Sequence, residues 1–220
     1  MISDNRTERN KCRRNLGRWA AAICLVLAFS AVPAHADLII SLQPVTLNPA
    51  PGDSGDALEV VLHNTGSDVH IAGFNFDIST SDTDITFTDA TFNTVLNPYI
   101  FAGNSLFGPD IVNPGFTPGQ EISASDSVSN PGTFTTLTSS QDLSLGEVFY
   151  NVAQNAALGP ANITFNQGNT TLSDENTNPV IITTSQDLTI DIETPEPSTI
   201  AMTLGAAALV AALVKRKRSA

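Results

Sequence analysis

Few of the side chains that commonly carry out catalysis lie in the long interior of this 220-residue chain, residues 37–214. Both cysteines, Cys12 and Cys24, precede this interior, so it offers no thiol nucleophile, no disulfide and no thiolate metal ligand. A catalytic triad would have to use His63 or His70, but no Gly-x-Ser-x-Gly motif marks a serine. We expect the two histidines to flank one hairpin loop, where a two-histidine metal site is the alternative to a solvated turn. The sequence therefore predicts a protein that is not an enzyme.

Acidic residues in two predicted loops are the candidates for binding a cation. Asp82, Asp84 and Asp89 lie in and around one loop, and residues 174–176 lie in the other. Carboxylate oxygens suit calcium, but neither stretch has the spacing of a twelve-residue calcium-binding loop. The alternative is that these side chains accept hydrogen bonds within their own turns. We expect no cofactor, with calcium at the first loop as the candidate exception. Any two of the many carboxylates could also face each other as in a glycosidase, so an envelope hydrolase is a minor alternative.

The net charge of −12 conceals an uneven distribution of charge along the chain. Residues 37–214 contain 20 of the 22 acidic residues, all except Asp4 and Glu8, and no Lys or Arg. The ten basic residues lie at the two ends: Arg6, Arg9, Lys11, Arg13, Arg14, Arg18, Lys215, Arg216, Lys217 and Arg218. Nucleic-acid binding depends on Lys and Arg contacts to phosphate, so this composition excludes it.

Aromatic side chains that could stack on a sugar are scarce. The single tryptophan, Trp19, lies near the amino terminus, which leaves Tyr99 and Tyr150 in the interior. Tyr150 belongs to a predicted core strand, whereas Tyr99 lies in a long irregular connection and is the candidate ligand contact. The alternative is that Tyr99 closes one end of the folded domain.

These candidate residues must be positioned by β-strands, because the interior contains short β-rich runs and no helical period. Residues 58–63 and 71–78 alternate apolar and polar side chains, which predicts strands with one buried face. Frequent turn residues and the lack of crossover helices predict one antiparallel β-sandwich domain, residues 37–193. The predicted strands are residues 38–42, 58–63, 71–78, 85–92, 121–128, 133–138, 146–153, 161–165, 180–184 and 187–192.

The first 36 residues have the composition of a secretory signal peptide. A basic stretch precedes the apolar run 19–32, and small residues, Ala34 and Ala36, follow it. The apolar run is too short to cross a hydrocarbon core of about 30 Å without strain. We expect the general secretion machinery to export the chain and signal peptidase to cut before Asp37. A pair of adjacent arginines leaves twin-arginine export as the alternative.

Residues 194–220 have the order of a second signal. A Pro-Glu-Pro motif precedes an apolar run, about residues 199–214, which predicts a short transmembrane helix. Four cations follow the run, an arrangement that favours a cytoplasmic end. The motif consists of Pro195, Glu196, Pro197, Ser198 and Thr199, and the basic stop consists of Lys215, Arg216, Lys217 and Arg218.

In this order of motif, helix and basic end, the terminus resembles the PEP-CTERM sorting signal of bacteria that build extracellular polysaccharide. The resemblance implies that a membrane protease-transpeptidase, called exosortase, cuts near the motif and passes the protein to the cell surface or its polymer matrix. A single-span anchor that stays uncut is the alternative. We therefore expect an exported protein with a membrane-anchored precursor, delivered to the cell envelope, cell surface or extracellular matrix.

The order of turns and strands between the two signals is similar to that of cohesin-like domains. Pro51-Gly52-Asp53 precedes an alternating strand, and the glycine-containing run 71–78 follows it. The second half of the pattern consists of residues 145–152, 159–165, 171–174 and 181–192. The resemblance implies a jelly-roll sandwich of about nine strands, a fold shared with carbohydrate-binding modules.

Two functions of a non-enzymatic kind follow from these features. The first is a structural or adhesive component of the envelope or of the extracellular polysaccharide matrix. The alternative is a specific binding module for polysaccharide or a protein partner, anchored at the cell surface, in which Tyr99 would contact the ligand.

Overall fold

The computed structural model describes residues 37–108, 110–112 and 116–194, and these residues form strands and turns with no helix. The predicted signal peptide (1–36) and the whole carboxyl-terminal signal from residue 195 onward lie outside the described residues. Within the described ranges, no helix is long and apolar enough to cross a membrane. The predictions for the two ends therefore stay predictions.

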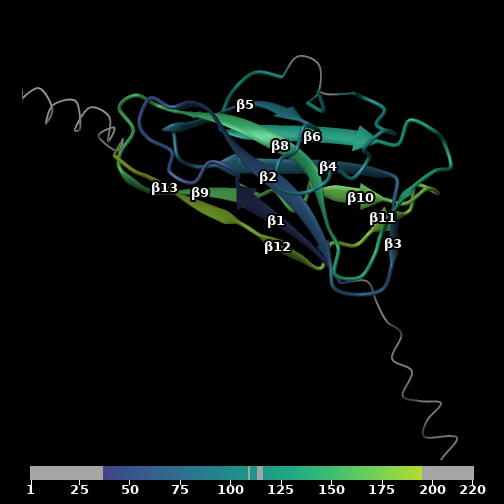
Figure 1. Ribbon diagram of the computed structural model, residues 1–220. Helices are drawn as coiled ribbons and strands as arrows, with labels where there is room; N and C mark the ends of the chain where they lie inside the picture. Colours follow the sequence, from purple (N-terminus) through teal and green to yellow (C-terminus); the bar gives the residue numbers. More distant parts are fainter. Residues whose placement is uncertain (1–36, 109, 113–115, 195–220) are drawn as a thin grey trace, which may run out of the picture. The chain divides into compact units, whose positions relative to one another are not determined.

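One sheet is built around two long central strands. Its strands are β1 (Leu38–Pro44), β2 (Ser54–Asn64), β5 (Ile85–Thr91), β8 (Asp142–Val152) and β12 (Thr184–Gln186). They lie in the order β12-β1-β2-β8-β5, with β2 and β8 side by side (Figure 1). Leu58, Val60 and Val148 point into the core, so the intervening Glu59 and Glu147 project from the outer face.

The second sheet is organised around β4. Its strands are β4 (Gly73–Thr80), β6 (Glu121–Ser127), β9 (Gly159–Phe165), β10 (Thr171–Ser173), β11 (Pro179–Val180) and β13 (Leu188–Ile192). They follow the order β11-β10-β4-β9-β13, and β6 also pairs with β4. A separate two-stranded ribbon joins β3 (Val69–Ile71) to β7 (Thr135–Leu137). Small polar side chains of β4, β6 and β10 therefore form one outer surface.

The hydrophobic core fills the space between the two sheets. Strand alternation supplies it, with Leu38 and Ile40 from β1 and Phe74, Phe76 and Ile78 from β4. All five side chains are at most 5% exposed, so the apolar positions of the alternating pattern lie in the core. The all-β sandwich predicted from the sequence is confirmed.

Several local predictions are wrong in a consistent way. The described residues contain 13 strands, whereas local pattern predicted ten and the resemblance implied about nine, because two predicted strands are each divided and β10 lies outside the ten predicted ranges. The predicted strand 71–78 breaks at Ala72, where the chain leaves the β3–β7 ribbon and enters β4. The predicted strand 180–184 divides into β11 and β12, because residues 181–183 cross from one sheet to the other. After this crossing β12 runs parallel to β1, an exception to the antiparallel pairing expected.

Candidate binding surfaces

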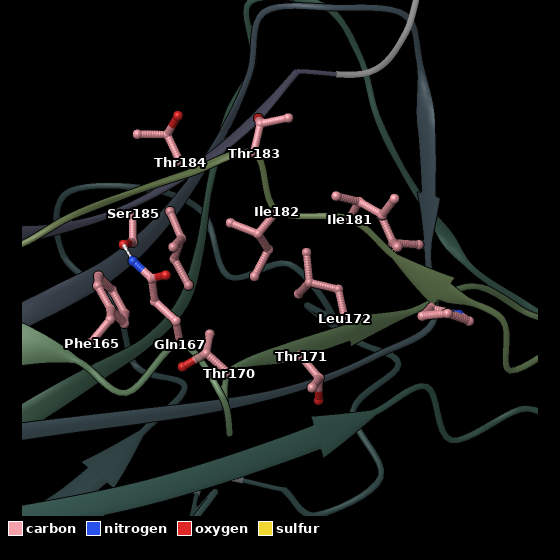
Figure 2. Close-up of a pocket in the computed structure, with 13 residues that line it drawn as sticks. Phe165, Gln167, Thr170, Thr171, Leu172, Ile181, Ile182, Thr183, Thr184 and Ser185 are labelled. Atoms are coloured by element: carbon pink, nitrogen blue, oxygen red, sulfur yellow. Dashed lines mark hydrogen bonds between the residues drawn. The ribbon is translucent and has the colours of Figure 1, made fainter.

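A cleft of about 530 Å³ lies where residues 181–183 cross between the sheets. Ile182 and Leu172 point toward one another in it (Figure 2), and the buried Ile40 also lines it. Gln167 reaches across to the other sheet and donates a hydrogen bond from Nε2 to Ser185 Oγ, 2.7 Å away (Figure 2). The cleft thus has an apolar floor and a rim of amide and hydroxyl groups.

The chemistry of this cleft is restricted by what lines it. Among its described lining residues there is no Asp, Glu or His. Acid–base catalysis needs a titratable group within hydrogen-bond reach of the substrate, so the cleft provides none of its own. Its hydroxyl groups belong to Thr170, Thr171, Thr183, Thr184 and Ser185. The cleft is therefore suited to holding an apolar group and unsuited to hydrolysis.

A second hollow, of about 320 Å³, lies on the outer face of the second sheet. Ser127, Gly73 and Ser173 are successive partners across β6, β4 and β10, and they form part of its floor. A Cβ atom on Gly73 would lie 2.9 Å from Ser173 Oγ, so glycine keeps this row shallow. Phe107 lines the same hollow and is 56% exposed. An apolar ring therefore lies beside a floor of small hydroxyl side chains.

Asp126 holds the segment that carries Phe107. Its side chain is buried at the end of β6, where Oδ2 accepts hydrogen bonds from Tyr99 Oη and Ser105 Oγ. Its Oδ1 accepts the backbone N–H groups of Leu106 and Phe107, both at 3.2 Å. Leu106 is 55% exposed, so two neighbouring apolar side chains project from a fixed backbone. The exposed pair is a feature of the fold, because a buried carboxylate ties it to the sheet.

Tyr99 is not the exposed ligand contact that the sequence suggested. It is 6% exposed, its ring packs against Phe92 at a centroid distance of 5.4 Å, and its hydroxyl donates to Asp126. Burial, and next the hydrogen bond to Asp126, raise its pKa far above the ordinary value of 10.0. Tyr99 is thus part of the buried core. Tyr150 is fully buried in β8, as expected of a core strand.

The two histidines do not flank a common hairpin. His63 lies in β2, which pairs with β1 and β8, and its Nδ1 contacts Asp142 Oδ1. His70 lies in β3, stacks on Phe134 with ring centroids 3.7 Å apart, and has Nδ1 3.4 Å from Glu175 Oε1. Each imidazole therefore has its own carboxylate. The two histidines do flank the loop 65–68, as predicted, but this loop is not a hairpin, because β2 and β3 do not pair.

The acidic loop residues act mainly as turn acceptors. Asp82 Oδ1 accepts the N–H of Asp84 at 2.9 Å, and Asp84 Oδ2 accepts the N–H of Ala157 at 2.9 Å. Asp89 Oδ1 accepts the N–H of the next residue. In the described parts of the chain, no three His, Cys, Asp or Glu side chains form a group that could hold a metal ion. The structure thus does not assemble the predicted calcium ligands Asp82, Asp84 and Asp89 into one such group.

The second acidic stretch has the same role. Asp174 accepts hydrogen bonds from the side chain of Asn178 and from the N–H groups of Asn176 and Asn178. The side-chain hydrogen bond from Asn178 is the largest cause that lowers the pKa of Asp174 below its ordinary value. This carboxylate stabilises the turn after β10, as the alternative interpretation expected.

Comparison with known proteins identifies the fold. No protein family and no curated protein matches the chain. CaCohA2 of Clostridium acetobutylicum, solved in complex with CaDoc0917, has a TM-score of 0.53 and 21% identity over 71% of this chain and 99% of that one. The seventh ScaB type I cohesin of Pseudobacteroides cellulosolvens has a TM-score of 0.51 and 11% identity, over 74% and 96% of the two chains.

A third similar structure is the third cohesin ScaC of Acetivibrio cellulolyticus in complex with the ScaB dockerin. It has a TM-score of 0.51 and 12% identity, and the match covers 70% of this chain and 98% of that one. At such identities a structural likeness establishes the fold and leaves the ligand open. The chain therefore has the β-sandwich fold of cohesin domains.

Proposed function

We propose that the chain is a non-catalytic binding module that holds a protein partner at the hollow beside Phe107. The observation that carries the proposal is the exposed pair Leu106 and Phe107, each more than half exposed. Asp126 fixes their backbone next to the floor formed by Gly73 and its neighbours. A rigid apolar anchor beside a shallow polar floor is typical of protein-binding surfaces, since little order is lost when a partner binds.

The charge of the domain specifies the kind of partner. Residues 37–194 contain no Lys or Arg, and they contain every acidic residue except Asp4, Glu8 and Glu196. A partner with Lys or Arg around its apolar contact would therefore be attracted, whereas an acidic polymer would be repelled. The ScaC cohesin was solved with a dockerin bound, which supports a protein partner for a sandwich of this kind.

The lack of a marked catalytic centre supports a binding role. The large cleft has no titratable side chain among its described lining residues. The hollow beside Phe107 is lined by one carboxylate, Asp126, whose two oxygens already accept five hydrogen bonds. Catalysis by this group would require breaking the contacts that position the segment.

We further propose that the module is exported and delivered to the cell envelope or extracellular matrix. The signal-peptide pattern of residues 1–36 and the motif Pro195-Glu196-Pro197 support this location. An exosortase-type protease would cut near the motif, after the membrane helix has held the precursor. Fractionation of cells should show a shorter, released form of the protein that disappears when the motif is replaced by alanines. If the full-length protein stays in the membrane both with the original motif and with the alanine replacement, the membrane segment is a permanent anchor.

Binding is tested by replacing the exposed ring. The Phe107→Ala variant of the full-length chain should bind a purified surface protein of the producing organism at least tenfold more weakly than the wild type. Leu158→Ala is the matched control, because Leu158 is also 56% exposed but does not line the hollow. Binding should weaken as salt rises, because the partner supplies the cations.

Two outcomes would contradict the proposal. Equal loss of affinity in the Phe107 and Leu158 variants would show that the hollow is not the contact surface. Selective binding of purified polysaccharide, with no protein bound at comparable affinity, would favour a carbohydrate-binding module instead.

A further inference from the structure

The cleft between the sheets lies where the outer strand of the second sheet is interrupted. β11 pairs with β10 as far as Val180, which is opposite Leu172, and β13 resumes at Leu188, opposite Ile163 of β9. Between these two points the chain leaves the second sheet and forms β12 on the first. In the described part of the chain, no outer strand therefore covers residues 165–171, and the cleft of about 530 Å³ opens there.

The interruption leaves aliphatic side chains next to solvent. Ile40 and Leu172 line the cleft and belong to the core. Ile182 packs against this core but stays partly exposed, and Ile181 beside it is 75% exposed. Apolar surface of this kind is unfavourable in water, so a chain of methylene groups that covered it would gain free energy by displacing the water.

The apolar lining favours an alkyl chain over a sugar ring. Sugars commonly stack on the open face of an aromatic side chain. Phe165 is the one aromatic residue among the described lining residues, and it is only 8% exposed. The cleft thus offers aliphatic contacts and no aromatic platform.

One polar group is held over this aliphatic surface. Gln167 donates the hydrogen bond from Nε2 to Ser185 Oγ that joins the two sheets, and this bond fixes the orientation of the amide. The Oε1 atom of Gln167 is directed toward Ile182 (Figure 2), and no hydrogen bond within the described residues uses it. An oriented acceptor of this kind selects a ligand that can donate a hydrogen bond, as a hydroxyl group does.

The cleft disfavours charged ligands. Its described lining residues include no Asp, Glu, His, Lys or Arg, so an ion would lose its hydration there without gaining a partner. Anions are disfavoured further, because the Asp187 carboxylate accepts the N–H of Phe165 at 3.0 Å, at the border of the cleft. The volume of the cleft lies within the roughly 300–1,000 Å³ of small-molecule sites.

We propose that the cleft binds a free aliphatic alcohol, whose alkyl chain covers Ile182 and Leu172 and whose hydroxyl donates to Gln167 Oε1. This function goes beyond the protein-binding role of the hollow beside Phe107, because Phe107 does not line the cleft.

The test follows the methyl resonances of Ile40, Leu172 and Ile182 by NMR while 1-octanol is added to the full-length chain. A position-specific signal is needed because the apolar runs 19–32 and 199–214 also attract alcohols. The three resonances should shift together and saturate. From 1-hexanol to 1-heptanol to 1-octanol, each added methylene should strengthen binding about fourfold. Octanoate has the same chain length but a negative charge, and it should bind about tenfold more weakly than 1-octanol.

Substitution of Gln167 tests the polar contact. Gln167 is exposed, so Gln167→Ala should fold, and it should weaken binding of 1-octanol about fivefold through the lost hydrogen bond. Gln154→Ala is the matched control, because Gln154 is also an exposed amide but does not line the cleft, and it should bind as the wild type does. Phe107→Ala should also retain the alcohol, so failure of this site and failure of the protein-binding hollow are distinguishable.

Four outcomes would overturn the proposal. The first is that 1-octanol leaves the three methyl resonances unchanged, and the second is that octanoate binds as tightly as 1-octanol. The third is equal affinity in Gln167→Ala and Gln154→Ala. The fourth is that the peptide amide Lys-Leu-Lys shifts these resonances at lower concentration than 1-octanol, since the cleft would then be a docking site for a protein side chain.

Discussion

Adding one methyl group at Gly146 in β8 should strongly lower the free energy of unfolding of the domain. A Cβ atom there would lie 2.5 Å from Ile111 Cδ1, 3.2 Å from the carbonyl oxygen of Thr91 and 3.7 Å from Phe76 Cε1. The backbone φ of Gly146 is +156°, which L-residues rarely adopt. The ladder between β2 and β8 shifts register next to Gly146, so the chain has little freedom to move the new atom away.

The expected cost of Gly146→Ala has two parts. Overpacking against the buried Ile111 costs about 1–3 kcal/mol, and the backbone strain adds about 1–3 kcal/mol. We expect the free energy of unfolding to fall by about 2–6 kcal/mol, a large part of the roughly 5–15 kcal/mol of a typical domain. Urea denaturation measures it, and the Tm should fall by about 3 °C for each kcal/mol.

A second substitution separates the two parts. Ile111→Val deletes the Cδ1 atom that the new methyl group meets, at its own cost of about 1 kcal/mol. In the double variant Gly146→Ala with Ile111→Val, the cost of the glycine substitution should therefore shrink by about 1–2 kcal/mol. Gly168→Ala is the control, because a Cβ atom there would meet nothing nearer than 3.6 Å, and we expect a change within about 0.5 kcal/mol.

The reasoning fails if Gly146→Ala lies within about 0.5 kcal/mol of the wild type. It also fails if Gly146→Ala lowers the free energy of unfolding equally in the wild type and in the Ile111→Val variant. The predicted contact between the new methyl group and Ile111 Cδ1 would then contribute nothing.

The remaining predictions concern the buried tyrosine and the ends of the chain. Tyr99→Ala should lower the free energy of unfolding by about 3–5 kcal/mol in urea denaturation, as for other buried aromatic residues, whereas Tyr99→Phe should cost only about 1 kcal/mol through the lost hydrogen bond to Asp126. A stable Tyr99→Ala variant that lost only ligand binding would contradict the buried placement. Trypsin should produce no cleavage between Asp37 and Val214 even in the denatured chain, because this stretch contains no Lys or Arg. Mass spectrometry of the digest checks this prediction. A tryptic fragment that ends between residues 37 and 214 would show that the purified protein has a different sequence from this chain.

Features that depend on local periodicity were predictable from the chain alone. The alternation in residues 58–63 and 73–78 predicted the strands β2 and β4, because successive side chains of a strand point to opposite sides. The prediction that β2 has one buried face is wrong, since residues 56–62 are buried on both faces. The same reasoning predicted Tyr150 in the core of β8. It could not predict the break at Ala72, which depends on the change of strand partner from β7 to the second sheet.

The placement of the aromatic residues needed the tertiary structure. Tyr99 and Phe107 lie in the same long connection, and no local pattern separates them. The hydroxyl of the buried Tyr99 donates a hydrogen bond to Asp126, 27 residues further along, and the same carboxylate accepts the backbone N–H of Phe107, whose ring is exposed. The contact that decides between them joins two distant segments, so the sequence could not show which of the two rings is exposed.

The sequence by itself determined the composition of the domain: all β, without cysteine, and with every Lys and Arg confined to the two ends. These properties need no knowledge of which strands are neighbours. Only the tertiary structure decided that Glu59 and Glu147, 88 positions apart, face each other under a connection that buries both. The physical reason is that strand register brings distant residues together, and the cost of burying two acidic side chains side by side arises only once they share one face of a sheet.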